Sequence, residues 1–175
     1  MAFRRERGCL GLDTLKMINL KIGDKAPDFE LNDAKGNKTK LADFRGKKII
    51  LYFYPRDDTS GCTKEACNFR DNFKGLRKFN IEIIGISNDN EQSHKKFTEK
   101  YSLPFKLLCD VDKEVSKKYG VYELKNFMGR SYYGITRSTF IIDEKGKITD
   151  IFYKVNPEKH VYEVKEKIKQ NFINY

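Results

Sequence analysis

The sequence has no tryptophan, only two histidines and four cysteines, and no long apolar run, and these shortages exclude several classes of protein. A membrane-spanning helix needs about 20 consecutive apolar residues, and no stretch of the chain approaches that length. Four cysteines in 175 residues are too few for a disulfide-stapled scaffold. The histidines and cysteines lack the spacing of a zinc site, and no haem or flavin motif occurs. The few cysteines therefore suit a reducing compartment and thiol chemistry.

The chain is strongly basic, with a formal net charge of +10 and a pI near 9.3. Such a charge can attract nucleic acid or an anionic surface. The lysines are nevertheless mixed with acidic residues, and no block of five or six like charges occurs. We therefore do not expect specific nucleic-acid binding or membrane association.

The length of 175 residues indicates one domain with a substantial core. We expect this domain to span residues 20–175 and a mobile extension to span residues 1–19. Met1–Lys16 has arginines but lacks the apolar region of a secretory signal. Met17 could be an internal start, so the extension could be native targeting sequence or a segment added for expression. We expect a cytoplasmic protein, or an organellar or nuclear one if the extension is native.

The hydrophobic pattern alternates between strands and helices. It predicts strands at Phe29–Leu31, Lys38–Lys40, Lys48–Tyr54, Ile81–Ser87, Phe105–Cys109, Ser138–Asp143 and Ile148–Tyr153. It predicts helices at Cys62–Phe79, Asn90–Tyr101, Lys113–Tyr119 and Glu158–Phe172, and a loop at Tyr122–Tyr133. This order indicates an α/β domain that begins with a hairpin, and the pattern alone leaves several α/β topologies open.

One stretch carries the strongest chemical signal. The apolar strand Lys48–Tyr54 runs into a short polar loop broken by Pro55 and Gly61, and Cys62 then opens a helix. Open α/β sheets place their chemistry where a strand ends and a helix begins. The free N–H groups and the positive dipole end of a helix favour a thiolate over a thiol. Cys62 is therefore a candidate nucleophile, and the alternative is a buried structural cysteine.

The residues around this cysteine resemble a known signature. Pro55-x-x-x-Thr59-x-x-Cys62 resembles the active-site motif of the peroxiredoxins. The longer string Phe53–Cys67 is similar to one branch of that family, the bacterioferritin-comigratory or Q-type peroxiredoxins. Ser60 departs from the pattern, because that branch usually has proline there. Proline, threonine and cysteine of the motif are all present.

The resemblance continues downstream and covers the chain from about Ile22 to the C-terminus. Arg137–Asp143 is similar to the strand on which the family carries its active-site arginine. The resemblance implies a thioredoxin-like fold with an N-terminal β-hairpin and a mixed central sheet flanked by helices. It implies reduction of hydrogen peroxide and organic hydroperoxides, with thioredoxin or a similar dithiol as reductant and no metal or cofactor. Q-type relatives are often monomeric, so we expect a monomer.

The resemblance also implies a role for each motif residue. The thiolate of Cys62 would attack the peroxide and become a sulfenic acid. Pro55 would shield the sulfur, and the hydroxyl of Thr59 would face the sulfur and the peroxide. The guanidinium of Arg137 would stabilise the thiolate and the charge that builds on the leaving oxygen. Arg130 is the weaker candidate for this cation.

Cys67 is the resolving cysteine that the resemblance implies, and it would form an intramolecular disulfide with Cys62. Five residues along a helix separate two Cα atoms by roughly 8.6 Å. A disulfide needs them within about 7 Å, so the helix must unwind from Cys62 to about Phe69 for the pair to close. Cys9 in the extension and Cys109 at a strand end, the latter expected to be a buried thiol, are the alternatives.

Other polar residues receive plainer interpretations. His94 and His160 lie among charged residues, and we expect both at the surface. Asp57 and Asp58 are expected to be turn residues rather than metal ligands.

Two other functions stay open. A disulfide reductase or isomerase is less favoured, because its usual motif is Cys-x-x-Cys and four residues separate Cys62 from Cys67. A basic binding protein would show salt-sensitive DNA binding that survives Cys62→Ser.

Overall fold

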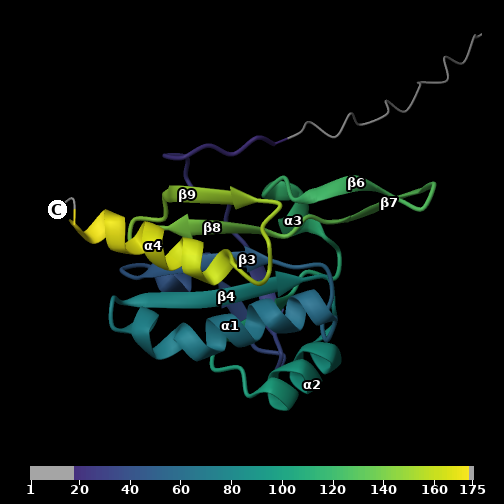
Figure 1. Ribbon diagram of the computed structural model, residues 1–175, viewed down its shortest axis with the longest axis horizontal. Coiled ribbons are helices and arrows are strands. Elements are labelled where there is room, and N and C mark those ends of the chain that lie inside the picture. The colour runs from purple at the N-terminus through teal and green to yellow at the C-terminus, as the bar shows by residue number, and fades with distance from the viewer. Residues whose placement is uncertain (1–17, 174–175) are drawn as a thin grey trace, which may run out of the picture.

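The fold is built on a seven-stranded mixed sheet, and the computed structural model describes residues 18–173 (Figure 1). The strands are β1 (Glu30–Asp33), β2 (Lys38–Lys40), β3 (Lys48–Phe53), β4 (Ile81–Ser87), β5 (Lys106–Cys109), β6 (Tyr122–Phe127), β7 (Arg130–Ile135), β8 (Ser138–Ile142) and β9 (Ile148–Tyr153). The helices are α1 (Ser60–Arg77), α2 (Glu91–Tyr101), α3 (Glu114–Lys118) and α4 (His160–Ile173), with a 3-10 turn η1 (Leu41–Phe44). The sheet order is β2-β1-β5-β4-β3-β8-β9, and β6 and β7 form a separate hairpin.

Strand β3 is central to the sheet and is buried on both faces. It pairs in parallel with β4 and antiparallel with β8. Ile50 and Tyr52 belong to the core that contains the apolar side chains of α1 and α4. Leu51 and Phe53 belong to a second core that also includes Val115 of α3. Burial on both faces explains why the strand sequence is continuously apolar. Figure 1 shows α1 and α4 together on one side of the sheet.

The three parallel strands fix where polar loops can meet. Strands β3, β4 and β5 run in the same direction, with α1 and α2 as their crossover connections. Their carboxyl ends therefore lie at one edge of the sheet. The loop after β3, residues 54–59, and the loop after β4, residues 88–90, are brought together at this edge.

Most of the predicted elements are confirmed. The N-terminal hairpin, the strands of the central sheet and the four helices all occur in the predicted order. Helix α1 begins at Ser60, two residues before its predicted start, and Cys62 remains in its first turn. Of the predicted extension, residues 1–17 lie outside the described residues, and the boundary at residue 20 stays a prediction.

The predicted loop at Tyr122–Tyr133 is wrong, because these residues form the β6–β7 hairpin. Met128 and Gly129 both have positive φ at its tip, which is the geometry of a tight two-residue hairpin turn. Side chains on both faces of this hairpin are largely exposed, so burial did not supply the usual strand pattern. The hairpin projects from the body of the molecule (Figure 1).

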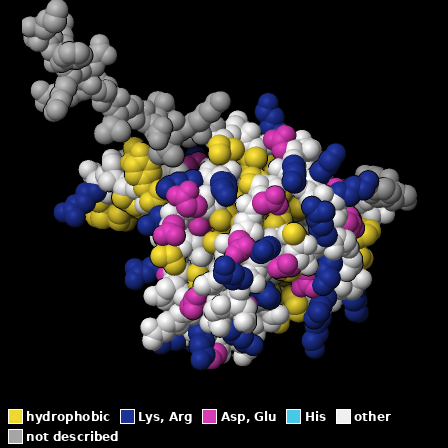
Figure 2. All heavy atoms as spheres, turned by 180° about the vertical axis from the view of Figure 1, so that it is seen from behind, with side chains coloured by type: hydrophobic (Ala, Val, Ile, Leu, Met, Phe, Trp, Pro, Cys, Tyr) yellow, Lys and Arg dark blue, Asp and Glu magenta, His cyan; other side chains and the backbone are white. Residues whose placement is uncertain are grey.

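The surface agrees with the interpretation of the basic charge. On the face seen in Figure 2, lysine and arginine side chains are interspersed with aspartate and glutamate. No helix among residues 18–173 is long and apolar enough to cross a membrane.

Candidate active site

Topology brings the predicted cysteine and arginine together. Strand β3 ends at Phe53 and leads through the polar loop into α1. Strand β8 is antiparallel to β3, and its first residue, Ser138, pairs with Phe53. Arg137 immediately precedes β8, so it lies at the edge of the sheet where α1 begins. Cys62 and Arg137 are 75 residues apart in sequence and yet adjacent in space.

Cys62 lies in the first turn of α1, and its side chain is buried. The Nη2 atom of Arg137 donates a hydrogen bond to the Cys62 sulfur over 3.2 Å. The first N–H groups of a helix have no partner within the helix, and together with the dipole they favour a negative charge. A sulfur anion at this position would therefore face both the helix N-terminus and a guanidinium.

Glu65 holds the other arm of the same guanidinium, and the sequence interpretation assigned it no role. The Nη1 atom of Arg137 donates to Oε2 of Glu65 over 2.5 Å. Glu65 is fully buried, and its second oxygen, Oε1, has no hydrogen-bond partner among the described residues. Glu65 lies three residues after Cys62 and therefore on the same face of α1. The three-residue spacing is the signal in the sequence that places Glu65 beside Cys62. Burial of this face of α1 then brings Glu65 into contact with Arg137.

Burial and charge act in opposite directions on this pair. At Glu65, burial outweighs the attraction of Arg137 and raises the pKa of the carboxyl to about 7. Burial also opposes the charge on Arg137, but Glu65 and Cys62 outweigh it and raise the pKa of the guanidinium. The difference follows from exposure, because the Arg137 side chain keeps 15% of its surface and that of Glu65 keeps none. One cation therefore serves two groups that can each be anionic.

Glu65→Gln should change how stability depends on pH. Glu65 has a pKa of about 7 in the folded state, above its ordinary 4.5, so the folded state binds this proton more tightly. Its stabilising contribution is complete below pH 4.5 and is lost as the pH rises to about 7. Glutamine keeps the shape and cannot ionise, so the variant should exceed the parent stability by up to about 3 kcal/mol at pH 8. Denaturant unfolding of reduced protein at pH 5 and pH 8 measures this, and an equal difference at both pH values would contradict it.

The loop before Cys62 ends the strand and starts the helix. Pro55 has no N–H group and follows the last sheet hydrogen bond, from Tyr54 N to the carbonyl of Ile86 at 3.0 Å. Thr59 is the N-cap residue of α1 and is exposed. Its hydroxyl donates to the carbonyl of Arg56 over 3.2 Å rather than to the sulfur. The resemblance implies that this hydroxyl faces the Cys62 sulfur, and in this structure it is bound to the backbone instead.

The other candidates take different positions. Cys67 is half-buried on α1, which is continuous through both cysteines, and Cys62, Cys67 and Cys109 are all free thiols. Cys109 ends β5 and is buried, as predicted, whereas Cys9 lies outside the described residues. Arg130 begins β7 and is exposed.

Both histidines are buried, so the prediction that they lie at the surface is wrong. His94 lies on the face of α2 that also carries Phe97, and this face packs on the core. His160 begins α4 and makes a hydrogen bond over 2.7 Å to the hydroxyl of Thr139. Burial and the charge of Arg137 lower the pKa of His160 to about 4, so it is neutral at pH 7. Charged sequence neighbours concealed the helical spacing that turns both rings inward.

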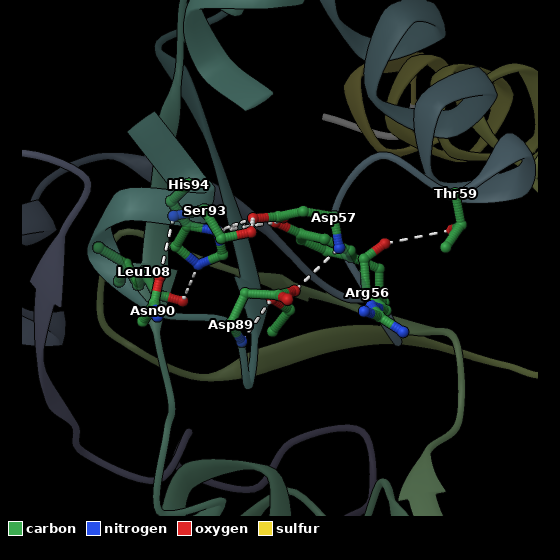
Figure 3. Close-up of polar contacts among 10 residues, drawn as sticks. Arg56, Asp57, Thr59, Asp89, Asn90, Ser93, His94 and Leu108 are labelled. Carbon is green, nitrogen blue, oxygen red and sulfur yellow. Dashed lines mark hydrogen bonds and ion pairs between the residues drawn. The ribbon is translucent and has the colours of Figure 1, made fainter. Parts of the chain in front are cut away.

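The two aspartates of the loop also differ from each other. Both are in the loop, as predicted, but Asp57 is buried while Asp58 is exposed. Ligand atoms of Asp57, Asp89 and His94 lie within 4.8 Å of one another, which is close enough to hold a cation. Figure 3 shows that Asp57 and His94 face each other and that Asp57 also contacts Asp89. These contacts are hydrogen bonds between the residues themselves.

A mixed sheet flanked by helices, with a buried cysteine in the first turn of a helix and a half-buried arginine donating to its sulfur, is the arrangement of a thiol-dependent peroxidase of thioredoxin-like fold. Comparison with known proteins makes the family definite. A family model described as "AhpC/TSA family" matches residues 22–151, and the chain belongs to this family, the peroxiredoxins.

Relatives agree in sequence and in structure. The chain is 49% identical over 147 residues to a putative peroxiredoxin bcp of Coxiella burnetii, covering 84% of this chain and 97% of that protein. It is 44% identical over 152 residues to Peroxiredoxin Bcp of Bacillus subtilis, covering 87% and 97%. A cysteine mutant of Xylella fastidiosa PrxQ superposes with a TM-score of 0.83 at 29% identity, covering 87% and 98%. A mutant of Peroxiredoxin Q of Xanthomonas campestris superposes with a TM-score of 0.78 at 31% sequence identity, covering 82% of this chain and 91% of that chain. The predicted family, fold and enzyme class are confirmed.

Proposed function

We propose that this chain reduces hydrogen peroxide and small organic hydroperoxides through the thiolate of Cys62. The observation that carries the proposal is the 3.2 Å contact between the Cys62 sulfur and the Arg137 guanidinium in the first turn of α1. The thiolate attacks the distal oxygen of the peroxide, an S–O bond forms and the O–O bond breaks. The leaving oxygen takes a proton and departs as water or an alcohol, and Cys62 becomes a sulfenic acid.

Three neighbours support this step. Arg137 stabilises the thiolate before attack and the leaving oxygen afterwards, where negative charge develops. The hydroxyl of Thr59, directed at the Arg56 carbonyl in this structure, turns to the peroxide when substrate is present. Pro55 ends the strand and limits access of water to the sulfur.

Cys67 completes the cycle in this proposal. Its thiol attacks the sulfenic sulfur of Cys62, water leaves, and an intramolecular disulfide forms. A dithiol reductant of the thioredoxin type then restores both thiols by exchange, which balances the two electrons given to the peroxide. We further propose that the protein works as a monomer in a reducing compartment. Light scattering of the reduced and oxidised protein tests the monomer.

Closure of this disulfide requires the start of α1 to unwind. The helix places the two Cα atoms roughly 8.6 Å apart, and a disulfide needs about 7 Å. Two contacts hold the first turns of α1 in place. Lys64 forms an ion pair with Glu158. The Asn68 amide donates to the carbonyls of Pro157 and Glu158, over 3.4 Å in both cases. All of them tie α1 to the segment before α4, so this is the surface that must open.

The test is a single turnover with one equivalent of hydrogen peroxide, followed by thiol counting and peptide mapping. The parent chain should lose two thiols and yield a Cys62–Cys67 crosslink. Cys67→Ser should lose one thiol at an unchanged rate and accumulate sulfenic acid, because only the second step is blocked. A normal disulfide yield in Cys67→Ser would assign the resolving step to Cys9 or Cys109. Slow oxidation with no preference for Cys62 would overturn the proposed function.

Amide hydrogen exchange tests the unwinding separately. We expect the segment from Cys62 to about Phe69 to exchange at least about tenfold faster in the oxidised protein, because its helical hydrogen bonds are lost. The C-terminal half of α1 provides an internal control and should keep its protection. Equal protection of residues 62–69 in both redox states would contradict the unwinding.

A further inference from the structure

A buried polar network lies beneath the active-site loop, and its centre is Asp57 (Figure 3). The Asp57 side chain is only 3% exposed. Its Oδ1 accepts from the Tyr54 hydroxyl over 2.6 Å. Its Oδ2 accepts from Nδ1 of His94 over 2.7 Å and from the Ser93 hydroxyl over 2.8 Å. Both oxygens of the Asp57 carboxyl group therefore accept hydrogen bonds, one at Oδ1 and two at Oδ2.

His94 must carry two protons in this arrangement. Its Nδ1 faces the Asp57 carboxylate, and its Nε2 faces the carbonyl of Leu108 over 3.0 Å. A neutral imidazole has one N–H group, whereas here both nitrogens meet acceptors. Burial opposes the charge, but Asp57, with help from Cys109, outweighs it and raises the pKa of His94 to about 10. Asp57 and His94 therefore form a buried and fully hydrogen-bonded ion pair.

The backbone of the loop is fixed at the same point. The N–H of Asp57 donates to Oδ2 of Asp89 over 2.8 Å, and that oxygen also accepts from the Ser87 hydroxyl over 2.7 Å. Asp57 is thus held through its side chain by α2 and through its backbone by the loop after β4. Because Asp57 already accepts three donors and the imidazole is protonated, the group works as a hydrogen-bond network and not as a set of free metal ligands.

The next residue leads directly to the reacting groups. Asp58 has a φ of 54°, a left-handed conformation that non-glycine residues seldom adopt. It turns the chain from the pinned Asp57 to Thr59, the N-cap of α1. The side chain of Asp58 is bound at the surface by Lys100 and Tyr101 of α2, at 2.8 and 2.7 Å. Helix α2 therefore holds the loop at two consecutive residues, one buried and one exposed.

We propose that Asp57 and His94 are positioning residues of the peroxidase reaction, which fix the loop so that Pro55 and Thr59 face the peroxide above Cys62. This inference rests on the proposed function, in which Cys62 is the nucleophile. The pair does not touch the sulfur and acts through the loop. It therefore governs how well a peroxide is oriented and leaves the nucleophilicity of the thiolate unchanged. A displacement of about 1 Å at a reacting group can lower a rate by about 100-fold.

The experiment compares two reactions of the same sulfur in Asp57→Asn and His94→Asn. One is oxidation of Cys62 by hydrogen peroxide in stopped flow, which needs the oriented pocket. The other is alkylation of Cys62 by iodoacetamide at the same pH, which needs only the thiolate. We expect the peroxide rate constant to fall about 10- to 100-fold while alkylation stays within about twofold. Asp28→Asn is the matched control, because it makes the same chemical change outside the active-site loop, at an aspartate whose ion pair with Lys25 is exposed, and it should change neither rate.

Contrary results are equally specific. An unchanged peroxide rate in both variants would overturn the inference, and so would an equal fall in both reactions, since that would indicate a lost thiolate. Faster alkylation would report an opened structure, and Ser93→Ala then serves as a milder variant that removes one donor. It should lower the peroxide rate about threefold or more with normal alkylation, and an unchanged peroxide rate would overturn the inference.

Two measurements separate this inference from its premises. In the parent protein, nitrogen-15 NMR should find both ring nitrogens of His94 protonated at pH 8, and a neutral ring would overturn the ion pair. If Cys62→Ser still consumes peroxide, the proposed function fails. If Cys62→Ser is inactive and Asp57→Asn reacts normally, only the positioning inference fails.

Discussion

Cys62→Ser should abolish peroxide reduction, with a fall of at least about 1,000-fold, to the level of the uncatalysed reaction. The serine hydroxyl keeps the size of the side chain and can still accept a hydrogen bond from Arg137. It does not ionise near neutral pH, however, so no nucleophile of comparable strength replaces the thiolate. Stopped-flow consumption of hydrogen peroxide by the reduced protein measures the effect, and the melting temperature shows whether the fold is retained.

Cys67→Ser is the matched control for this experiment, because it makes the same chemical change five residues along the same helix. It should still consume one equivalent of peroxide at the parent rate. If Cys62→Ser consumed peroxide and Cys67→Ser did not, the two cysteines would have to exchange their assigned steps. If both variants consumed peroxide normally, the nucleophile would be another thiol, and Cys109 would be the candidate among the described residues.

The part of the site that sequence predicts well is the part built from local signals. An apolar run ending at a proline predicts a strand end, and a polar loop followed by apolar residues at helical spacing predicts a helix start. These signals placed Cys62 in the first turn of α1, as the structure has it. The position of Arg137 was a different matter, because nothing local connects residues 62 and 137. Only the resemblance to a family indicated it, and the antiparallel pairing of β3 with β8 explains it.

The residues that sequence missed are those whose behaviour depends on burial. Glu65, His94 and His160 each stand among charged or polar neighbours, so each has the sequence context of a solvated residue. Packing of α1, α2 and α4 on the sheet removes all three from water. Burial disfavours the charged form of each, so it raises the pKa of Glu65 and lowers that of His160, whereas at His94 the partner Asp57 outweighs burial and raises the pKa. Composition and spacing contain no measure of such partners.

Arg137→Lys should lower the rate constant for oxidation of Cys62 by peroxide about 100- to 1,000-fold, although it keeps the positive charge. In the parent structure one guanidinium nitrogen binds Glu65 and the other binds the sulfur. An ammonium is a single point of charge and cannot span both. The buried carboxylate of Glu65 would hold it, and the sulfur and the leaving oxygen would lose their donor. Arg130→Lys is the control, because Arg130 is exposed, and its rate should stay within about twofold.

A second substitution distinguishes loss of the two-armed contact from loss of positive charge at the sulfur in this variant. In Arg137→Lys combined with Glu65→Gln, no buried carboxylate competes for the ammonium, so the lysine is free to approach the sulfur. We expect the double variant to recover about tenfold of the lost rate, because a charge near the sulfur is restored without the two-armed contact. Recovery to the parent rate would mean that positive charge alone suffices. It would contradict the need for a two-armed contact from Arg137. No recovery, with both variants folded, would mean that the second arm on the sulfur and the leaving oxygen carries the whole effect. Near-parent activity of Arg137→Lys itself would contradict the requirement for a guanidinium at this position.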